Sequence, residues 1–248
     1  MIKEYFNIRY ELDPAEVLSA IDCRVAEGPA GYVCVADGNI LARVQKDEAY
    51  RAVVNGGMFS ICDSGWVPLY LKMIYGFRPE QYCGSRIFAD VTSMRKYRML
   101  FLGSSSEVLE ALRANLIDID PEIAGMTFSE LPFCKVEDFD YEAIASAINA
   151  DNPDIVWLSL GAPKQEQFAA RLMPHLNRGV VIPVGAVFNF RAGLGISRAP
   201  AWMVRMRIEF LYRIFSEPRK QLRRCALIIG SLPSTLAAEI RRKKTCNQ

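Results

Sequence analysis

The stretch 154-DIVWLSLGAPKQEQFAARLMP-174 decides the fold class of this chain. Its first seven residues are mostly apolar, which is typical of a strand buried on both faces. A loop that begins with Gly161 follows, and then a helical pattern that Pro174 ends. The same order, a strand, a polar loop and a helix, recurs at residues 97–116, and residues 180–184 read as a third buried strand. Strand, helix and strand at this spacing predict a parallel sheet with helices on both faces.

Two further strands and a helix are expected upstream of these elements, and only helices downstream. The upstream elements are a strand at 31–36 (GYVCVA), a helix at 40–55 and a strand at 58–62 (MFSIC). The downstream ones are helices at 202–215, 219–229 and 232–242, with Pro218 between the first two. The prediction is therefore a Rossmann-like α/β body at residues 1–197, followed by a basic helical appendage at residues 198–248.

Composition places the chain among soluble globular proteins. Of its 248 residues, 51% are hydrophobic and 23% are charged, which excludes disordered, collagen-like and coiled-coil chains. No run approaches the roughly 20 apolar residues that span a bilayer, and the first residues lack the apolar segment of a signal peptide. None of the seven cysteines forms a C-x-x-C pair, so neither a disulfide framework nor a zinc ribbon is indicated. We expect a cytoplasmic protein.

Charge is distributed unevenly along the chain. The appendage carries twelve Lys/Arg against three Asp/Glu, whereas residues 1–197 carry eighteen against twenty-five. Such a tail suits an anionic partner, for which nucleic acid, a diphosphate and anionic lipid are the candidates. A solvated helix surface is the alternative. No nucleic-acid partner is expected, because the apolar residues of the tail are patterned along helices.

Polar loops follow three of the predicted strands, at residues 62–65, 103–106 and 161–166. Ligands of open parallel sheets bind at this edge, where helix N-termini offer free N–H groups to phosphates. Ser104 and Glu107 fit a capping box for the helix after the second loop. The chain contains neither G-x-G-x-x-G nor a Walker A motif, which argues against NAD enzymes and P-loop NTPases.

Few side chains are candidates for catalysis. Asp63 directly follows a predicted strand, where a carboxylate can act as a general base or cap the next helix, and both interpretations stay open. His175 is the only histidine and is expected at a helix end, which excludes Ser-His-Asp schemes and histidine-rich metal sites. Asp118 and Asp120 form a D-x-D pair of the kind that can hold a cation, but we interpret it as a loop and cap feature.

Three motifs occur in order in the second half of the chain. They are DIVWLSLGAPKQE at 154–166, GAVFNFRAG…RAPAW at 185–202 and EFLYR…EPR at 209–219. They resemble the G-x-P-K-Q-E, G-x-x-F-D-x-x-A-G…R-A-P-x-W and E-W-x-x-R-L…E-P-x-R segments of the WecG/TagA/CpsF bacterial glycosyltransferases, glycosyltransferase family 26. The similarity extends faintly back to about residue 30, so it covers most of the chain.

The resemblance implies an inverting, metal-independent enzyme without a cofactor. Such enzymes move an N-acetylmannosamine-type or related sugar from UDP to an undecaprenyl-diphosphate-linked acceptor for cell-surface polysaccharides, at the inner face of the plasma membrane. The family's catalytic aspartate falls on Asp63 and its loop glutamine on Gln165. The expected substrate-binding residues are Val35, Asp37, Gln81, Arg86, Gly161, Pro163, Lys164, Glu166, Gly185, Phe188, Asn189, Arg198, Arg213 and Arg219. Backbone N–H groups near Gly161 and Gly185 would meet the nucleotide, and arginines of the appendage would offset diphosphate charge.

The chain departs from the family pattern around the expected donor site. The T-x-N near the first strand is replaced by 35-VAD-37, an arginine by Gln81 with Arg86 nearby, and the aspartate of the F-D pair by Asn189. A nucleotide-sugar-binding or scaffold protein without turnover is therefore the alternative. The appendage is expected to lie on anionic lipid of the inner leaflet or, alternatively, to pack on the body or a neighbouring subunit. The apolar stretch 66-WVPLYLKMIY-75 suggests self-association into a homo-oligomer.

Overall fold

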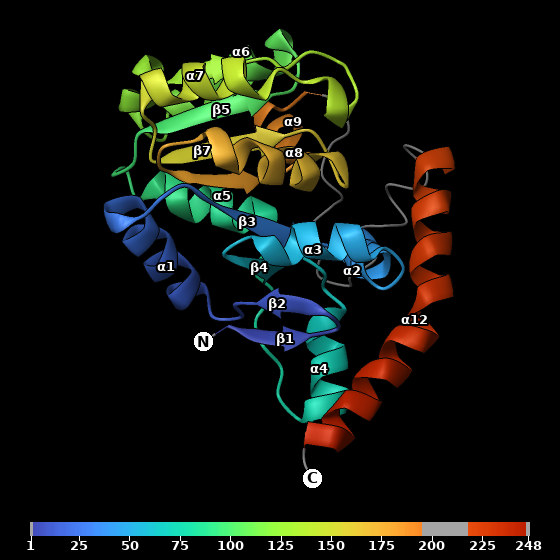
Figure 1. Cartoon of the computed structure of the whole chain (residues 1–248). Coiled ribbons are helices and arrows are strands. Elements are labelled where there is room, and N and C mark those ends of the chain that lie inside the picture. The colour runs from blue at the N-terminus through green and yellow to red at the C-terminus, as the bar shows by residue number, and fades with distance from the viewer. Residues whose placement is uncertain (1, 195–217, 247–248) are drawn as a thin grey trace.

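The structure is a computed structural model that describes residues 2–194 and 218–246. Within these residues an eight-stranded sheet forms the centre of the molecule (Figure 1). Its strand order is β1-β2-β4-β3-β8-β7-β5-β6, and every neighbouring pair except β1 with β2 is parallel. This confirms the predicted α/β fold with a Rossmann-like parallel sheet.

The strands are short and separated by helices. They are β1 (Lys3–Tyr5), β2 (Ile8–Tyr10), β3 (Gly31–Ala36), β4 (Phe59–Cys62), β5 (Met99–Gly103), β6 (Thr127–Ser129), β7 (Ile155–Ser159) and β8 (Val180–Pro183). The α-helices are α1 (Pro14–Glu27), α2 (Gly38–Val44), α3 (Glu48–Gly56), α4 (Val67–Tyr75), α5 (Gly84–Ser93), α6 (Ser106–Ile117), α7 (Tyr141–Asp151), α8 (Lys164–Leu172), α9 (Val187–Ala192) and α12 (Pro218–Cys246). Three 3₁₀ turns complete them: η1 (Pro121–Gly125), η2 (Val136–Asp138) and η3 (Met173–His175).

Two apolar layers cover the two faces of the sheet. Residues of α2, α3, α4, α7 and α8 pack on one face, and residues of α1, α5, α6 and α9 pack on the other. The inner strands β3, β4, β5 and β8 are buried at every position, which explains why their sequences are apolar without alternation. Because helices occupy both faces, a ligand can reach the sheet only at its edges.

The hairpin of β1 and β2 was not expected from the sequence. Its strands have three residues each, and its two-residue turn consists of Phe6 and Asn7, both at positive φ (53° and 61°). This turn geometry fits the right-handed twist of a hairpin, but it is usually signalled by glycine, which is absent here. The hairpin joins the sheet through β2, which pairs with β4 at Tyr10 and Ser60.

Three predictions of local structure are wrong in detail. The helix expected at 40–55 is divided into α2 and α3, because the Asp47 side chain accepts the Tyr50 N–H (2.9 Å) and starts a new helix. The capping box does not form: Ser105 is the N-cap of α6 without a side-chain bond, and Ser104 has a φ of 73°. Finally, the helices expected at 219–229 and 232–242 are one continuous helix, α12, with Pro233 inside it.

The helix α12 runs along the side of the molecule and changes direction midway (Figure 1). Proline in a helix interior lacks an N–H and crowds the preceding turn, so Pro233 accounts for the bend. The helix continues because it packs against α2 and α4 on the body. The helix expected at 202–215 and the expected domain boundary at 197/198 lie outside the described residues.

The stretch expected to drive self-association is partly covered by this helix. It forms α4, where the Tyr75 hydroxyl donates to Glu239 of α12 (2.7 Å) and Lys243 of α12 donates to the Ile74 carbonyl. Trp66 and Met73 remain exposed (46% and 78%), so an oligomer stays a prediction. In the described part of the chain, no helix combines the length and the apolarity needed to cross a membrane.

Candidate active site

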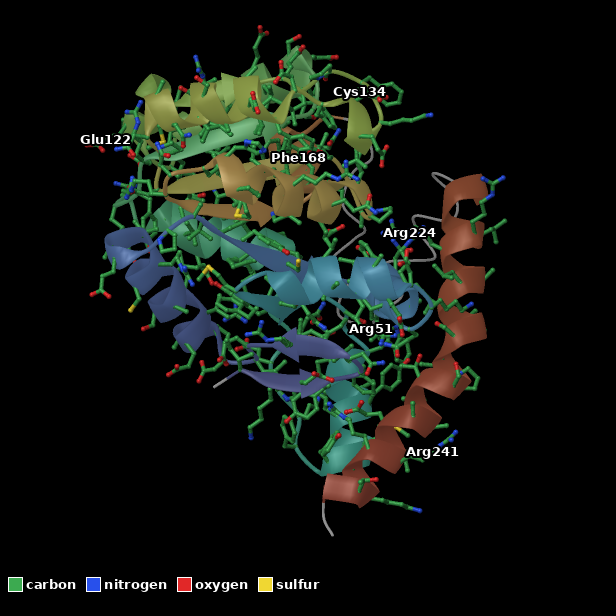
Figure 2. All side chains as sticks on the ribbon, in the orientation of Figure 1. Arg51, Glu122, Cys134, Phe168, Arg224 and Arg241 are labelled. Atoms are coloured by element: carbon green, nitrogen blue, oxygen red, sulfur yellow. The ribbon has the colours of Figure 1, made fainter. Side chains whose placement is uncertain are left out.

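A cavity of about 1050 Å³ lies at the carboxyl edge of the sheet. Each of five neighbouring strands contributes a residue just beyond its end: Asp37 after β3, Asp63 after β4, Val184 after β8, Leu160 after β7 and Ser104 after β5. Near its N-terminal end, α12 lines one side of the cavity with Arg223, Arg224 and Leu227. Figure 2 shows Arg224 pointing from α12 toward the body. The site therefore occupies the edge at which parallel sheets bind ligands.

The carboxylate of Asp63 is held at the wall of this cavity by a helix N-terminus. Its Oδ1 accepts the Gly84 N–H at 2.8 Å, where α5 begins. The Gln81 side chain donates to the Asp63 carbonyl at 2.6 Å, which fixes the backbone on the same side. The helix that directly follows Asp63 in sequence, α4, begins after Trp66 and has no side-chain cap. Asp63 thus binds a helix 21 residues away and does not cap the next one.

The loop after β7 is tied together by Gln165. Its Oε1 accepts the Gly161 N–H (3.0 Å), and its Nε2 donates to Glu166 Oε1 (2.8 Å). Gly161 has a φ of 78°, a conformation that residues other than glycine rarely adopt. Gly185 is close beside it, since a Cβ there would lie 3.2 Å from Gln165 Oε1. The Gly161 N–H is thus bonded within the protein, and a contact between the nucleotide and other N–H groups near Gly161 and Gly185 stays a prediction.

Glu166 lies behind the cavity and not in its wall. The side chain is fully buried, and Oε2 accepts a hydrogen bond from the Tyr50 hydroxyl of α3 at 3.0 Å. Burial raises the pKa of Glu166 to about 7, while the bonds from Gln165 and Tyr50 partly oppose this rise. Glu166 therefore supports Gln165 from behind.

Asp37 has two bonding roles at the end of β3. Its Oδ1 accepts the N–H groups of Asn39 and Ile40, both at 2.9 Å, and so caps α2. Its Oδ2 forms an ion pair with Arg224 of α12 at 2.7 Å. On the same helix α2, Arg43 donates to the Asn39 side chain (3.1 Å), and both side chains line the cavity. The cavity therefore holds two carboxylates and several guanidinium groups.

Comparison with protein families gives a match over nearly the whole chain. Residues 4–245 match the model of the glycosyl transferase WecG/TagA/CpsF family. The chain belongs to this family. The glycosyltransferase class expected from the three motifs is thereby confirmed.

Three curated relatives share one enzyme name, N-acetylglucosaminyldiphosphoundecaprenol N-acetyl-beta-D-mannosaminyltransferase. The Bacillus subtilis strain 168 protein is 27% identical over 203 residues, which cover 81% of this chain and 76% of that protein. The Bacillus spizizenii strain W23 protein is 24% identical over 225 residues, 88% of this chain and 82% of its own. The Staphylococcus aureus strain NCTC 8325 protein is 23% identical over 188 residues, covering 73% and 70%.

Eight of the residues expected from the family pattern come together in the cavity wall. They are Val35, Asp37, Asp63, Gln81, Gly161, Gln165, Gly185 and Asn189. They lie up to 154 residues apart in the chain, at strand ends, in loops and in the first turns of helices, and the parallel sheet brings them to one edge. Arg198 and Arg213 lie outside the described residues, as does the side chain of Arg219.

The other expected binding residues do not line the cavity. Arg86 pairs with Glu80 and lies over the Tyr82 ring, so it does not replace the missing arginine at position 81. Lys164 donates to the Cys134 carbonyl, and its Nζ lies 4.6 Å from the centre of the Phe139 ring. Pro163 is the N-cap residue of α8. Phe188 is fully buried among the aromatic rings of Phe88 and Phe101. The family's motif residues thus divide into wall residues and residues that build the fold behind them.

Several wall residues were missed by the sequence analysis. Asn39 and Arg43 follow the first predicted strand closely enough to have been considered. Arg223 and Arg224 belong to the appendage, whose arginines were expected to offset diphosphate charge, but they were not named as site residues. Cys83, Gly84 and Ser85 reach the site because Asp63 binds the start of α5. The D-x-D interpretation is confirmed, since Asp120 caps η1 by accepting the Glu122 N–H at 3.1 Å. Among the described residues, no three His, Cys, Asp or Glu side chains are grouped closely enough for a metal ion.

Proposed function

We propose that this chain transfers an N-acetylmannosamine-type sugar from a UDP-sugar to an undecaprenyl-diphosphate-linked saccharide, with inversion and without a metal ion or other cofactor. The acceptor and the sugar are those in the name of the curated relatives. The observation that carries the proposal is the position of Asp63, a carboxylate held by a helix N-terminus in the same cavity wall as Gln165. The product would enter cell-surface polysaccharide synthesis.

The chemistry is an in-line displacement at the anomeric carbon of the donor. Asp63 takes the proton of the acceptor hydroxyl, whose oxygen forms the new bond to the anomeric carbon while the bond to the UDP oxygen breaks. Gln165 contacts the reacting sugars. Negative charge develops on the departing UDP, and Arg43, Arg223 and Arg224 in the cavity wall stabilise it. Inversion follows because the nucleophile and the leaving group occupy opposite sides of that carbon.

Replacing the proposed base tests this function. Asp63→Asn keeps the size of the side chain and an acceptor oxygen for the Gly84 N–H, but it cannot take a proton. Because a positioned base contributes about 10²–10⁴ in rate, UDP release should fall by that factor while UDP-sugar binding stays within about threefold. Initial rates of UDP release with lipid-linked N-acetylglucosamine, together with calorimetric binding, measure both. Asp118→Asn, an exposed aspartate outside the cavity wall, should change neither. A turnover of Asp63→Asn within threefold of the wild type would exclude Asp63 as the base.

Binding without turnover is the second candidate, and one observation favours it. Gln81, at the position of the family's arginine, donates its side-chain amide to the Asp63 carbonyl, and this neutral side chain adds no positive charge to the cavity. A panel of UDP-sugars assayed for both binding and UDP release separates the two functions. Measurable binding with no release for any donor, in the presence of lipid-linked acceptor, would favour the scaffold.

We further propose that α12 and the segment before it hold the enzyme on anionic lipid of the inner leaflet. Leu222, Ile229 and Ile240 of α12 are exposed (57%, 69% and 44%), and the exposed cations Arg241 and Lys244 lie at its end. An apolar and basic helix of this kind can lie in the membrane interface.

Liposome co-sedimentation tests the membrane role. The wild type should bind vesicles that contain anionic lipid and should dissociate at roughly 0.5 M salt, because each basic residue contributes about 1 kcal/mol only within a Debye length. Removal of residues after Pro218 should abolish binding. Since that truncation also uncovers part of α4, the double variant Arg241→Gln with Lys244→Gln is the milder test and should weaken binding severalfold. Equal sedimentation of all three proteins would exclude the membrane role.

A further inference from the structure

A buried carboxylate lies directly behind the cavity and is bonded to one of the side chains that line it. Glu166 stands in the first turn of α8, where backbone N–H groups have no partner within the helix. Its carboxylate receives hydrogen bonds from Gln165 Nε2 (2.8 Å), from the Tyr50 hydroxyl (3.0 Å) and from its own backbone N–H. The group is fully buried, so these donors replace the water that it would otherwise bind.

The hydrogen bond that Gln165 donates to Glu166 determines how the carboxamide of Gln165 is oriented. A carboxamide can adopt two orientations related by a half turn, and its oxygen can only accept while its NH₂ can only donate. In the observed orientation the oxygen accepts from the Gly161 N–H and the NH₂ donates to Glu166. A half turn would break both bonds. An ionised Glu166, which only accepts, therefore permits one orientation.

We propose that Glu166 and Tyr50 are positioning residues for sugar transfer, which act through the carboxamide of Gln165. The inference rests on the proposed function, in which Gln165 contacts the reacting sugars. Within the described residues, Gln165 uses one of its two N–H donors and one of its two oxygen lone pairs. The remaining donor and lone pair can bond sugar hydroxyls, with a direction that Glu166 sets from behind.

The charge of Glu166 makes this arrangement dependent on pH. Burial raises the pKa of the carboxyl to about 7, so it is ionised above that pH and becomes protonated as the pH falls below it. A protonated carboxyl carries a donor of its own, and it no longer selects one orientation of the Gln165 amide. Sugar transfer should therefore weaken on the acid side of pH 7.

Few other titratable groups act on Glu166. Asp37 raises its pKa through charge repulsion, whereas Cys34 of β3 and Tyr50 of α3 stay neutral because burial raises their own pKa values. The strand β8 packs on α8 with no titratable side chain. The remaining groups on elements that pack against α8 are exposed or bonded elsewhere: Tyr32, Glu48, Arg51, Glu137, Asp138, Tyr141, Glu142, Asp151 and His175.

The pH profile of turnover in two variants tests the proposal. For the wild type, kcat should fall below pH 7. Glu166→Gln should lower kcat roughly tenfold to a hundredfold with KM within about threefold, and the acid limb should disappear because nothing titrates at that position. Tyr50→Phe should lower kcat by about threefold to tenfold and move the acid limb to higher pH, because the Tyr50 bond lowers the pKa of Glu166. Glu166→Gln or Tyr50→Phe with an unchanged acid limb would overturn the proposal.

A matched control removes the same chemical contact elsewhere. The Tyr97 hydroxyl is bonded to the Asp22 carboxylate at the amino edge of the sheet, so Tyr97→Phe also deletes a tyrosine–carboxylate bond. This variant should leave kcat and the acid limb unchanged. If it moved the limb as Tyr50→Phe does, the effect would reflect general loosening of the fold, and the positioning role would be wrong.

A readout without substrate separates this inference from the proposed function. The Gln165 side-chain amide resonance, assigned by its loss in Gln165→Met, should titrate with a midpoint about pH 7 in the wild type and not in Glu166→Gln. If that resonance titrates in a protein that transfers no sugar, the proposed function is refuted, whereas the contact between Gln165 and Glu166 is supported. Sugar transfer with no titration, and with an acid limb that persists in Glu166→Gln, would refute the positioning role alone.

Discussion

The two ends of α12 are attached to the body in opposite ways. Near its C-terminus, the buried carboxylate of Glu239 accepts from the Phe6 N–H (2.8 Å), the Tyr75 hydroxyl (2.7 Å) and Arg242 (2.6 Å). Arg242 also bonds Glu4 of the β1–β2 hairpin. Near its N-terminus, the polar contact described with the body is a single ion pair between Arg224 and Asp37, both partly exposed, and the side chain of Ile228 packs on α2 at Gly38.

This difference indicates that one end anchors the helix and the other end serves the site. A buried carboxylate with three donors holds its geometry, because each donor left unpaired would cost free energy. An exposed ion pair is nearly neutral for stability and can exchange its partner for a substrate anion. The C-terminal end of α12 is thus fixed to the β1–β2 hairpin. At the other end, Arg224 reaches the cavity and can exchange Asp37 for a substrate anion.

Removing the anchor should give the largest effect. Glu239→Ala leaves the Phe6 N–H, the Tyr75 hydroxyl and Arg242 without their acceptor, so the free energy of unfolding should fall by about 2–3 kcal/mol. Urea denaturation measures the loss, and hydrogen exchange should be faster at residues 231–246 than in the central strands. Glu110→Ala, on the exposed side of α6, is the control and should change stability by less than about 0.5 kcal/mol. Unaltered exchange at residues 231–246 in Glu239→Ala would show that this end is not an anchor.

An intermediate effect is expected at Asp37, which belongs to both the body and the contact with α12. Asp37→Ala removes the cap of α2 and should destabilise the protein by about 1 kcal/mol. Asp37→Asn keeps a capping oxygen and loses only the charge that pairs with Arg224, so it should cost less than about 0.5 kcal/mol. Thermal or urea unfolding of the two variants separates the cap from the ion pair. Equal losses in both would mean that the ion pair, and not the cap, carries the stability.

The smallest effect on stability is expected at the other end of the helix. Arg224→Gln should leave the free energy of unfolding within about 0.5 kcal/mol, because the ion pair that it breaks is partly exposed. It should raise KM for the lipid-linked acceptor or the donor about tenfold, the equivalent of about 1.4 kcal/mol. Arg95→Gln, an exposed arginine before β5 and outside the cavity wall, should leave both KM values unchanged. A destabilisation by Arg224→Gln as large as that by Glu239→Ala would contradict the division between the two ends.

The site could be predicted from the sequence only where the chain carries a local signal. Asp63, Gly161 and Gly185 follow buried strands directly, and the carboxyl ends of parallel strands meet at one edge, so their common location follows from the strand pattern. Glu166 and Lys164 stand beside Gln165 in the same motif, yet neither lines the cavity. Successive residues of a helix point about 100° apart, so a motif letter does not reveal which side chain faces a ligand.

The sequence by itself determined the family, the parallel sheet and the order along the chain of five of its strands, β3, β4, β5, β7 and β8. These follow from unbroken apolar runs, glycine-led loops and ordered motifs, all of which are local in the chain. The tertiary structure decided how α12 continues through Pro233, which hairpin holds it and which side chains meet in the cavity. The contact between Glu239 and Phe6 joins residues 233 positions apart, and that between Arg224 and Asp37 joins residues 187 apart. Such contacts depend on where folding places each surface, because a carboxylate accepts from any donor that comes within reach.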